Sequence, residues 1–295
     1  MDAMITVSKN DLRENRRAKA TAKIKQGILH LCILILLFFA VVPIYFLLIK
    51  SVKSPEQDTL DPFSITFPFL WDNYSLAWLF VKDYIMNTVI IALCQTLGTL
   101  LVCSFASYAF IRYKFPFKNV LFMIILAFMM VPGVLTLIPQ YRMVLVAFGL
   151  VNNYIGVILP AIAGAIPMGV FLLNTFFSGL PKDLFEAAEL DGASRIRQYF
   201  VVAIPLSVPI LSTLGIMQLM SAWNDLLWPS LILQDEKMHT ITIGLQPFTT
   251  SYTETYLSYG VPFAGYVIVS IPLLVIFFFA SKQFIRGLTS GAFKM

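Results

Sequence analysis

Residues 28–49 form an apolar run, ILHLCILILLFFAVVPIYFLLI, that contains no Asp, Glu, Lys or Arg. A stretch of about 20 mainly apolar residues is long enough to cross the hydrocarbon core of a bilayer as a helix. Lipid offers no partners to backbone N–H and C=O groups, so the run must satisfy these groups by its own helical hydrogen bonds. It is too long for the core of a cleavable signal peptide, and SVKSPEQD follows it instead of a small-residue cleavage site. We therefore expect a membrane-spanning helix.

Five more apolar segments of similar length follow along the chain. The composition agrees with this pattern, because 58% of the residues are hydrophobic and only 13% are charged, against about 25% charged in soluble domains. We expect an all-α integral membrane protein with six transmembrane helices. Their predicted positions are residues 28–49, 85–110, 119–145, 153–177, 204–231 and 262–284.

Lys and Arg are distributed unevenly between the segments that connect these spans. Of the 21 basic residues, 16 lie before the first span, between spans two and three, between spans four and five, or after the last span. Cytoplasmic segments of membrane proteins carry this excess. We therefore expect both termini in the cytoplasm. The net charge of +5 follows from this topology, so it gives no reason to expect a nucleic-acid partner.

The predicted topology divides the chain into five parts. Residues 1–27 form a basic cytoplasmic arm that precedes the first transmembrane helix, 28–49. Residues 50–84 form an external loop, in which Pro, Trp and Tyr favour a structure lying at the membrane interface. Residues 85–285 form the core of the protein, with a polar cytoplasmic loop at about 181–203, and residues 286–295 form a cytoplasmic tail.

The polar loop has the sequence signals of two short helices joined by a turn. Asp183 followed by Glu186 has the spacing of a capping box, which predicts a helix that runs to Asp191. Gly192 suits the left-handed position after a helix end, and Ser194 can cap a second short helix. A solvated loop would explain the charges but not two capped helices. The pattern indicates a helix-turn-helix projection that docks a soluble partner.

The sequence EAAELDGA, with the later AIPLSVP, resembles the EAA loop of binding-protein-dependent (MetI-like) ABC importer permeases. Order, spacing and position before the penultimate span all agree. The segments SVKSPEQ, NTVIIA, MMVPGVLTLIPQY, SAWNDLLWP and FIRGLTSGAFKM are similar to the carbohydrate branch of that family, in particular to the shorter permease subunit of maltose-type importers. The chain departs from the pattern in its longer basic arm and in its last residues, Phe-Lys-Met instead of Val-Lys-Gly.

The resemblance implies a prokaryotic permease of the cytoplasmic membrane that works by alternating access. It would pair with a second, non-identical permease subunit and with two cytosolic ATP-binding subunits, and would receive a sugar or oligosaccharide from an extracellular solute-binding protein. The EAA loop would couple ATP hydrolysis to transport. The positions carried over as ATPase-coupling residues are Glu186, Ala187, Ala188, Asp191, Gly192 and Ala193.

The sequence contains no recognisable catalytic motif. It has no G-x-x-x-x-G-K-[ST] phosphate loop and no H-E-x-x-H motif, so we expect no enzyme activity, cofactor or metal, and ATP hydrolysis in the partner subunits. An ion-coupled secondary transporter is the alternative from another class, for which Asp225 is the best acidic candidate within a span. If the chain is an ABC importer subunit but its substrate is not a sugar, the alternative substrates are a polyol or a glycerol phosphate.

The fifth span carries an unusual set of polar residues. Gln218, Ser221 and Asp225 share a helical face, and Asn224 is adjacent. Because polar groups are costly in lipid, this face predicts an aqueous path or external gate, an internally bonded carboxylate, or a proton site at Asp225. Asn87 is a further candidate for binding sugar hydroxyls. The third span contributes to the same path if Pro132 breaks it, since proline removes a helix hydrogen bond.

The second span has small and weakly polar residues at helical spacing. Thr96, Thr99, Cys103 and Ser107 recur every three or four residues, with Gly98 beside them. Small residues on one face allow helices to approach closely in a membrane. This face therefore predicts helix packing.

Overall fold

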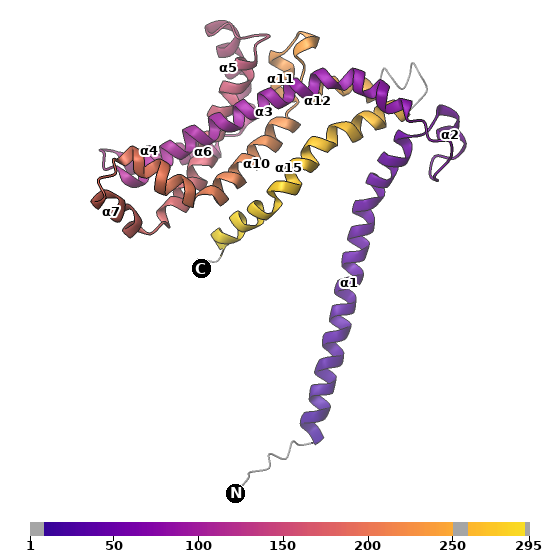
Figure 1. The fold of residues 1–295 in the computed structure, drawn as a ribbon, viewed down its shortest axis with the longest axis horizontal. Coiled ribbons are helices and arrows are strands. Elements are labelled where there is room, and N and C mark those ends of the chain that lie inside the picture. Colours follow the sequence, from indigo (N-terminus) through magenta and orange to yellow (C-terminus); the bar gives the residue numbers. More distant parts are fainter. Residues whose placement is uncertain (1–8, 250–258, 293–295) are drawn as a thin grey trace.

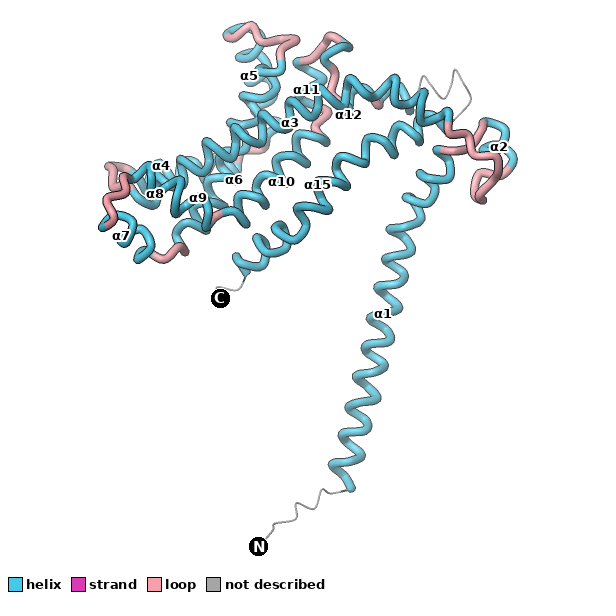
Figure 2. The backbone as a smooth tube through the Cα atoms, viewed as in Figure 1, coloured by secondary structure: helices cyan, strands magenta, loops and turns pink. Residues whose placement is uncertain are grey.

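The computed structural model describes residues 9–249 and 259–292, and every element in these ranges is helical (Figures 1 and 2). The prediction of an all-helical chain with several apolar helices is confirmed. Four helices are long and apolar enough to cross a membrane, and two bent helix pairs bring the number to six if each pair counts as one span. Of the predicted terminal parts, residues 1–8 and 293–295 lie outside the described residues.

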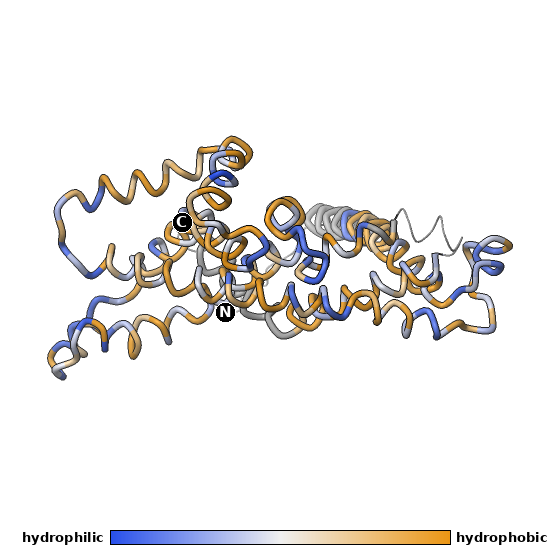
Figure 3. The backbone as a smooth tube through the Cα atoms, turned by 90° about the horizontal axis from the view of Figure 1, so that it is seen from above, coloured by the Kyte–Doolittle hydropathy of each residue, from blue (hydrophilic) through white to orange (hydrophobic). Residues whose placement is uncertain are grey.

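The four long helices each contain one predicted span. They are α1 (Lys9–Ser51), α3 (Asp72–Arg112), α6 (Tyr154–Ser178) and α15 (Gly260–Ala292). Seen from above in Figure 3, hydrophobic residues dominate the long helices, and hydrophilic stretches gather in the connections at their ends.

The predicted third span is two helices with a sharp bend between them. It comprises α4 (Lys118–Ala127), a 3-10 turn (Phe128–Met130), α5 (Gly133–Arg142) and a π-turn (Met143–Ala147). The two halves meet at 99°. Val131 and Pro132 have extended backbone between them, so the predicted break at Pro132 is confirmed.

The predicted fifth span, residues 204–231, is also bent and ends earlier than expected. A first half of α8 (Arg195–Gln198), a π-turn (Tyr199–Ala203) and α9 (Ile204–Leu206) meets α10 (Val208–Asn224) at 77°. After Asn224 the backbone of Asp225 is extended, and α11 (Leu227–Ile232) is a separate helix. The remaining short elements are α2 (Pro55–Leu60), α7 (Lys182–Leu190), η4 (Glu236–Met238), α12 (Ile241–Gly244) and α13 (Gln246–Thr249).

The centre of the molecule is the contact between α3 and α6. Thr99, Cys103 and Ser107 of α3 are fully buried, which confirms the predicted packing face. The Ser107 hydroxyl donates to the Val170 carbonyl at 3.2 Å. A Cβ built on Gly169 would lie 2.5 Å from the Cys103 sulfur, so this glycine is needed for the close approach of the two helices.

Residues 50–84 are more regular than the predicted external loop. They contain α2, whose capping box joins Ser54 and Gln57, and the first three turns of α3. The Asn73 side-chain amide donates to the carbonyls of Ser51 and Lys53, both at 3.0 Å. These bonds fasten the end of α1 to the start of α3.

Helix α1 ends at this junction, and the rest of the helix points away from the bundle, as Figure 1 shows. Among the longer helices it contacts α15. Between Ile24 and Leu48 most of its large apolar side chains are exposed, among them Leu36, Phe38 and Phe39. Nothing in the described chain covers this surface, so lipid or another protein must do so.

We predict that Gly169→Ala destabilises the protein by about 1–3 kcal/mol, the usual cost of forcing extra volume into a packed core. Gly164→Ala, in the same helix, is the matched control, because a Cβ there meets nothing within 4 Å. Alanine is the better helix former by up to about 1 kcal/mol, so the control should be neutral or stabilising. The measurement is thermal unfolding of the two purified variants in detergent, and equal stability of both would contradict the packing argument.

Candidate functional site

The predicted coupling residues lie on α7 and the turn that follows it. Helix α7 begins at Lys182, with Pro181 at the N-cap position and no side-chain cap. The predicted capping box between Asp183 and Glu186 is therefore wrong. With Pro181 as the N-cap, the helix starts two residues earlier than the predicted cap at Asp183 would give. Asp183 therefore lies within the first turn, where its charge favours the helix N-terminus.

One face of α7 is buried and the other is free. Phe185 is buried, Ala188 is half-buried, and Glu186 and Ala187 are exposed. Leu190 is 90% exposed and shares the free face with Glu186. The sequence interpretation did not single out Leu190, because only the burial of Phe185 shows which way the helix is turned.

The turn after α7 has the geometry that the sequence predicted. Gly192 has a φ of +78°. Its N–H donates to the Glu189 carbonyl at 3.1 Å, and the N–H of Ala193 donates to the Ala188 carbonyl at 2.9 Å. This pair of bonds is a Schellman motif, in which glycine takes the left-handed position. Asp191 and Gly192 are exposed at the tip of the projection, and Ala193 is half-buried.

The second helix of the projection is capped as predicted. The Ser194 hydroxyl accepts the N–H of Arg197 at 3.3 Å. The chain then continues through α8 and its π-turn, where Gln198 and Tyr199 are buried. The projection at 181–203 therefore has an exposed tip and a base that is packed against the bundle, as seen at α7 in Figure 1.

The polar face predicted on the fifth span is only partly present. Asn224 and Ser221 are exposed and Gln218 is half-buried. Met217 and Met220 are exposed beside them, so an open stripe at helical spacing runs along α10. No helix in the described part of the chain covers it.

Asp225 does not continue this helical face, because α10 ends before it. Its carboxylate accepts the N–H of Trp228 at 3.3 Å, and its carbonyl accepts the Thr242 hydroxyl at 2.7 Å. The side chain is half-buried and holds the turn between α10 and α11. Of the possibilities that the sequence left open for Asp225, these bonds favour the internally bonded carboxylate.

Asn87 is used within the protein. Its amide donates to the carbonyls of Lys237 and His239 at 2.8 and 3.0 Å, and its oxygen accepts the Tyr154 hydroxyl at 2.8 Å. The residue is 8% exposed. The structure therefore does not bring Asn87 to the open stripe of α10.

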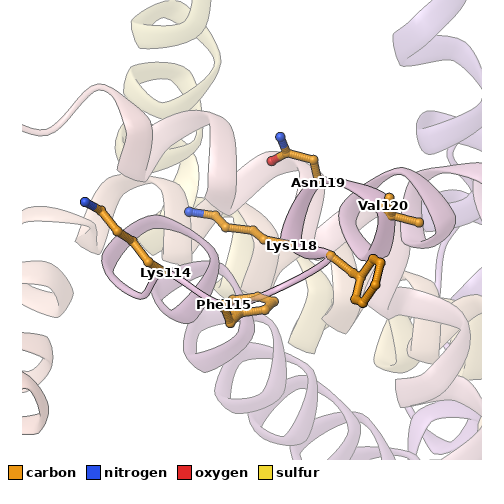
Figure 4. Close-up of a pocket in the computed structure, with 6 residues that line it drawn as sticks. Lys114, Phe115, Lys118, Asn119 and Val120 are labelled. Atoms are coloured by element: carbon orange, nitrogen blue, oxygen red, sulfur yellow. The ribbon is translucent and has the colours of Figure 1, made fainter.

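A hollow of about 370 Å³ lies beyond the far end of α3. Figure 4 shows the ammonium groups of Lys114 and Lys118 on the same side of it. Its lining residues are Lys114, Phe115, Phe117, Lys118, Asn119 and Val120. Asn87 and Arg112 are 25 residues apart on one helix, about 37 Å at 1.5 Å per residue, so the hollow is remote from Asn87.

Within the described residues, no group of three or more His, Cys, Asp or Glu side chains could hold a metal ion. Two exposed features correspond to the predicted sites. One is the tip of the 181–203 projection and the other is the open stripe of α10.

Comparison with known proteins identifies relatives over almost the whole chain. Residues 98–290 match the family model described as "Binding-protein-dependent transport system inner membrane component". The arabinooligosaccharides transport system permease protein AraQ of Halalkalibacterium halodurans is 31% identical, over 94% of this chain and 99% of that protein. The trehalose/maltose transport system permease protein MalG of Thermococcus litoralis is 33% identical, over 72% of this chain and 75% of that protein.

The fold is also similar to a solved structure. A chain from the crystal structure of a bacterial ABC transporter involved in the import of the acidic polysaccharide alginate superposes with a TM-score of 0.76. The two chains are 21% identical, and the match covers 95% of this chain and all of that one.

Proposed function

Because the chain belongs to the family of binding-protein-dependent transport system inner membrane components, we propose that it imports a sugar or oligosaccharide across the cytoplasmic membrane of a prokaryote. It is a transport component rather than an enzyme, as its relatives are permease subunits. Its partners are a second, non-identical permease subunit, two cytosolic ATP-binding subunits and an extracellular solute-binding protein. ATP binding to the partners switches the permease pair between two states that expose the path to opposite sides.

The observation that carries this proposal is the agreement among relatives that match nearly the full length. Their names include permeases for arabinooligosaccharides and for maltodextrin. An ion-coupled transporter is not favoured, because these relatives belong to ABC systems. Asp225, the best acidic candidate for an ion site, uses a carboxylate oxygen to accept the N–H of Trp228.

The topology follows from counting each bent pair as one span. Six spans place both termini on the same side, and the excess of Lys and Arg assigns that side to the cytoplasm. The projection at 181–203 then faces the ATP-binding subunits. Residues 1–27 form the cytoplasmic arm, 50–84 the outer connection, and 286–295 the tail.

The exposed tip of the projection is the coupling site. Glu186 and Ala187 lie on the free face of α7, and Asp191 and Gly192 lie at the turn. Ala188 and Ala193 hold the turn through their backbone bond. Small side chains at this tip let it enter a cleft on the ATP-binding subunit, while Glu186 supplies a charge for a basic partner.

The transport path runs along the open stripe of α10, with Gln218, Ser221 and Asn224 as its polar groups. Asp225 fixes the turn at the outer end of this stripe, and Asn87 holds residues 237–239, which follow α11. Exposed apolar residues of α5, such as Val134 and Ile138, supply further surface. The second permease closes the path from the other side.

Uptake measurements test the proposed energy source. Cells expressing the complete transporter should take up at least one labelled oligosaccharide from a panel of arabino-, malto- and chito-oligosaccharides. Depleting ATP, or adding vanadate to reconstituted vesicles, should stop this uptake, whereas collapsing the proton gradient at constant ATP should not. Uptake that survives ATP depletion and stops with the gradient would identify an ion-coupled transporter instead.

Gly192→Val should uncouple the complex. A side chain at its φ of +78° adds roughly 1–2 kcal/mol of backbone strain and enlarges the tip that meets the ATP-binding subunit. Gly149→Val is the matched control, because Gly149 has a φ of +61°, and like Gly192 it has nothing within 4 Å of a built Cβ. We expect uptake to fall roughly tenfold or more for Gly192→Val alone, within the usual range of coupling energies. Equal loss in both variants would mean that strain, not docking, is responsible.

Thiol labelling tests the orientation. In a background without native cysteines, Ile65→Cys lies in the outer connection and Lys114→Cys follows α3, both at exposed positions. An impermeant thiol reagent should label position 65 in intact cells and position 114 only after the membrane is opened. The reverse pattern would invert the topology.

A further inference from the structure

Three residues at the inner end of α3 hold the 181–203 projection. Ser104, Tyr108 and Arg112 are spaced four residues apart, so they lie on one helical face. The Ser104 hydroxyl is 2.6 Å from the Tyr199 hydroxyl, and the Tyr108 hydroxyl donates to the Arg195 carbonyl at 2.8 Å. Buried hydrogen bonds of this kind are costly to break, so the base of the projection is fixed to α3.

Arg112 is the residue on which both halves of the projection converge. Its guanidinium lies 4.4 Å from the centre of the Phe185 ring in α7, a cation–π distance. Its Nη2 donates to Gln198 Oε1 at 3.1 Å, and its carbonyl accepts from Arg195 at 3.4 Å. Thus Arg112 contacts both α7, through the Phe185 ring, and α8, through Gln198, beside the apolar cluster in which Phe185 packs with Tyr108 of α3.

Helix α3 is suited to act as a stiff connection. It has 41 residues, about 60 Å at 1.5 Å per residue, and contains no proline. Proline interrupts the helical hydrogen bonds where it occurs. Every other spanning segment contains at least one: Pro43, Pro132, Pro160, Pro205 and Pro272 are examples.

The other end of α3 holds the segment that follows the α10 stripe. Asn87 binds the carbonyls of Lys237 and His239, and the Thr88 hydroxyl accepts the N–H of Ile241 at 2.8 Å. One uninterrupted helix is therefore bonded at one end to the projection and, about 37 Å away, to the segment that begins α12.

We propose that α3 carries the displacement of the 181–203 projection to residues 237–241, and that Arg112 is the positioning residue that attaches α7 to it. This inference rests on the proposed function, since it concerns the same coupling site. The projection and α3 move as one unit when the ATP-binding subunits close, so the outer segment moves with the inner tip.

Arg112→Gln tests the attachment in the complete transporter, with Lys114→Gln as the control for loss of a positive charge two residues away. The probes are the arabino-, malto- and chito-oligosaccharides of the uptake assay. For Arg112→Gln we expect an intact purified complex that still hydrolyses ATP but imports roughly tenfold less sugar per ATP hydrolysed. Lys114→Gln should keep the wild-type ratio. Phe185→Leu should lower the ratio as Arg112→Gln does, with no added loss in the double variant.

An Arg112→Gln complex with the wild-type ratio would overturn the proposal, as would one that loses assembly and hydrolysis together, because that result indicates a general structural role. If the wild-type permease neither binds the ATP-binding subunits nor imports any probe, the proposed function itself would be refuted.

Distances between spin labels test whether α3 and the 181–203 projection move as one unit, and this test does not depend on transport activity. Labels replace Leu101 on α3 and Arg197 on the projection, both exposed, in nucleotide-free and vanadate-trapped complexes. A second pair of labels, one at Arg197 and one on the corresponding loop of the second permease, shows by its change in distance that the complex has switched between the nucleotide-free and the trapped state. We expect the Leu101–Arg197 distance to be the same in both states and to broaden in Arg112→Gln. A change of that distance between states in the otherwise wild-type protein would overturn the proposal.

Discussion

Two apolar helices in a membrane gain little from packing leucine against leucine, because lipid tails are as apolar as the side chains that replace them. Association must come from close backbone approach and from hydrogen bonds between helices. The contact between α3 and α6 supplies both, through Gly169 against Cys103 and through the Ser107 hydroxyl. Helices α10 and α15 then pack against α3. The position of every other functional element, including the 181–203 projection, depends on this central pair.

The two bent segments both carry proline, whereas α3 has none and is uninterrupted. Pro132 stands at a 99° bend, and the prolines around Ser207 stand near one of 77°. Both bends lie in segments that border the proposed path. Helix α3 lacks proline and is continuous from Asp72 to Arg112. A chain that must change shape while transmitting a displacement needs both kinds of segment, and here they are on different helices.

Much of the fold could be predicted from periodicity and length. The apolar helices, the packing face of α3 and the left-handed turn at Gly192 follow from local chemistry, because each depends on residues close in sequence. The prediction that Asp225 belongs to the polar face of α10 was wrong. It assumed that the helix continues to Asp225, whereas the helix ends at Asn224 and the Asp225 carboxylate accepts the N–H of Trp228. The role of Arg112 depends on Phe185 and Gln198, more than 70 residues away. Its only local signal was the four-residue spacing with Ser104 and Tyr108.

The open stripe of α10 also explains why the sequence does not select one sugar. Ser221 and Asn224 are exposed, and no helix in the described ranges faces them. A solute on this surface would contact this chain from one side only, so its remaining hydroxyl partners would have to come from another chain. Recognition of a sugar needs several hydrogen bonds with fixed geometry, because each unpaired polar group costs free energy on transfer from water. In the assembly proposed above, specificity would belong to the permease pair and to the binding protein, and this chain alone constrains the class of solute more than its identity.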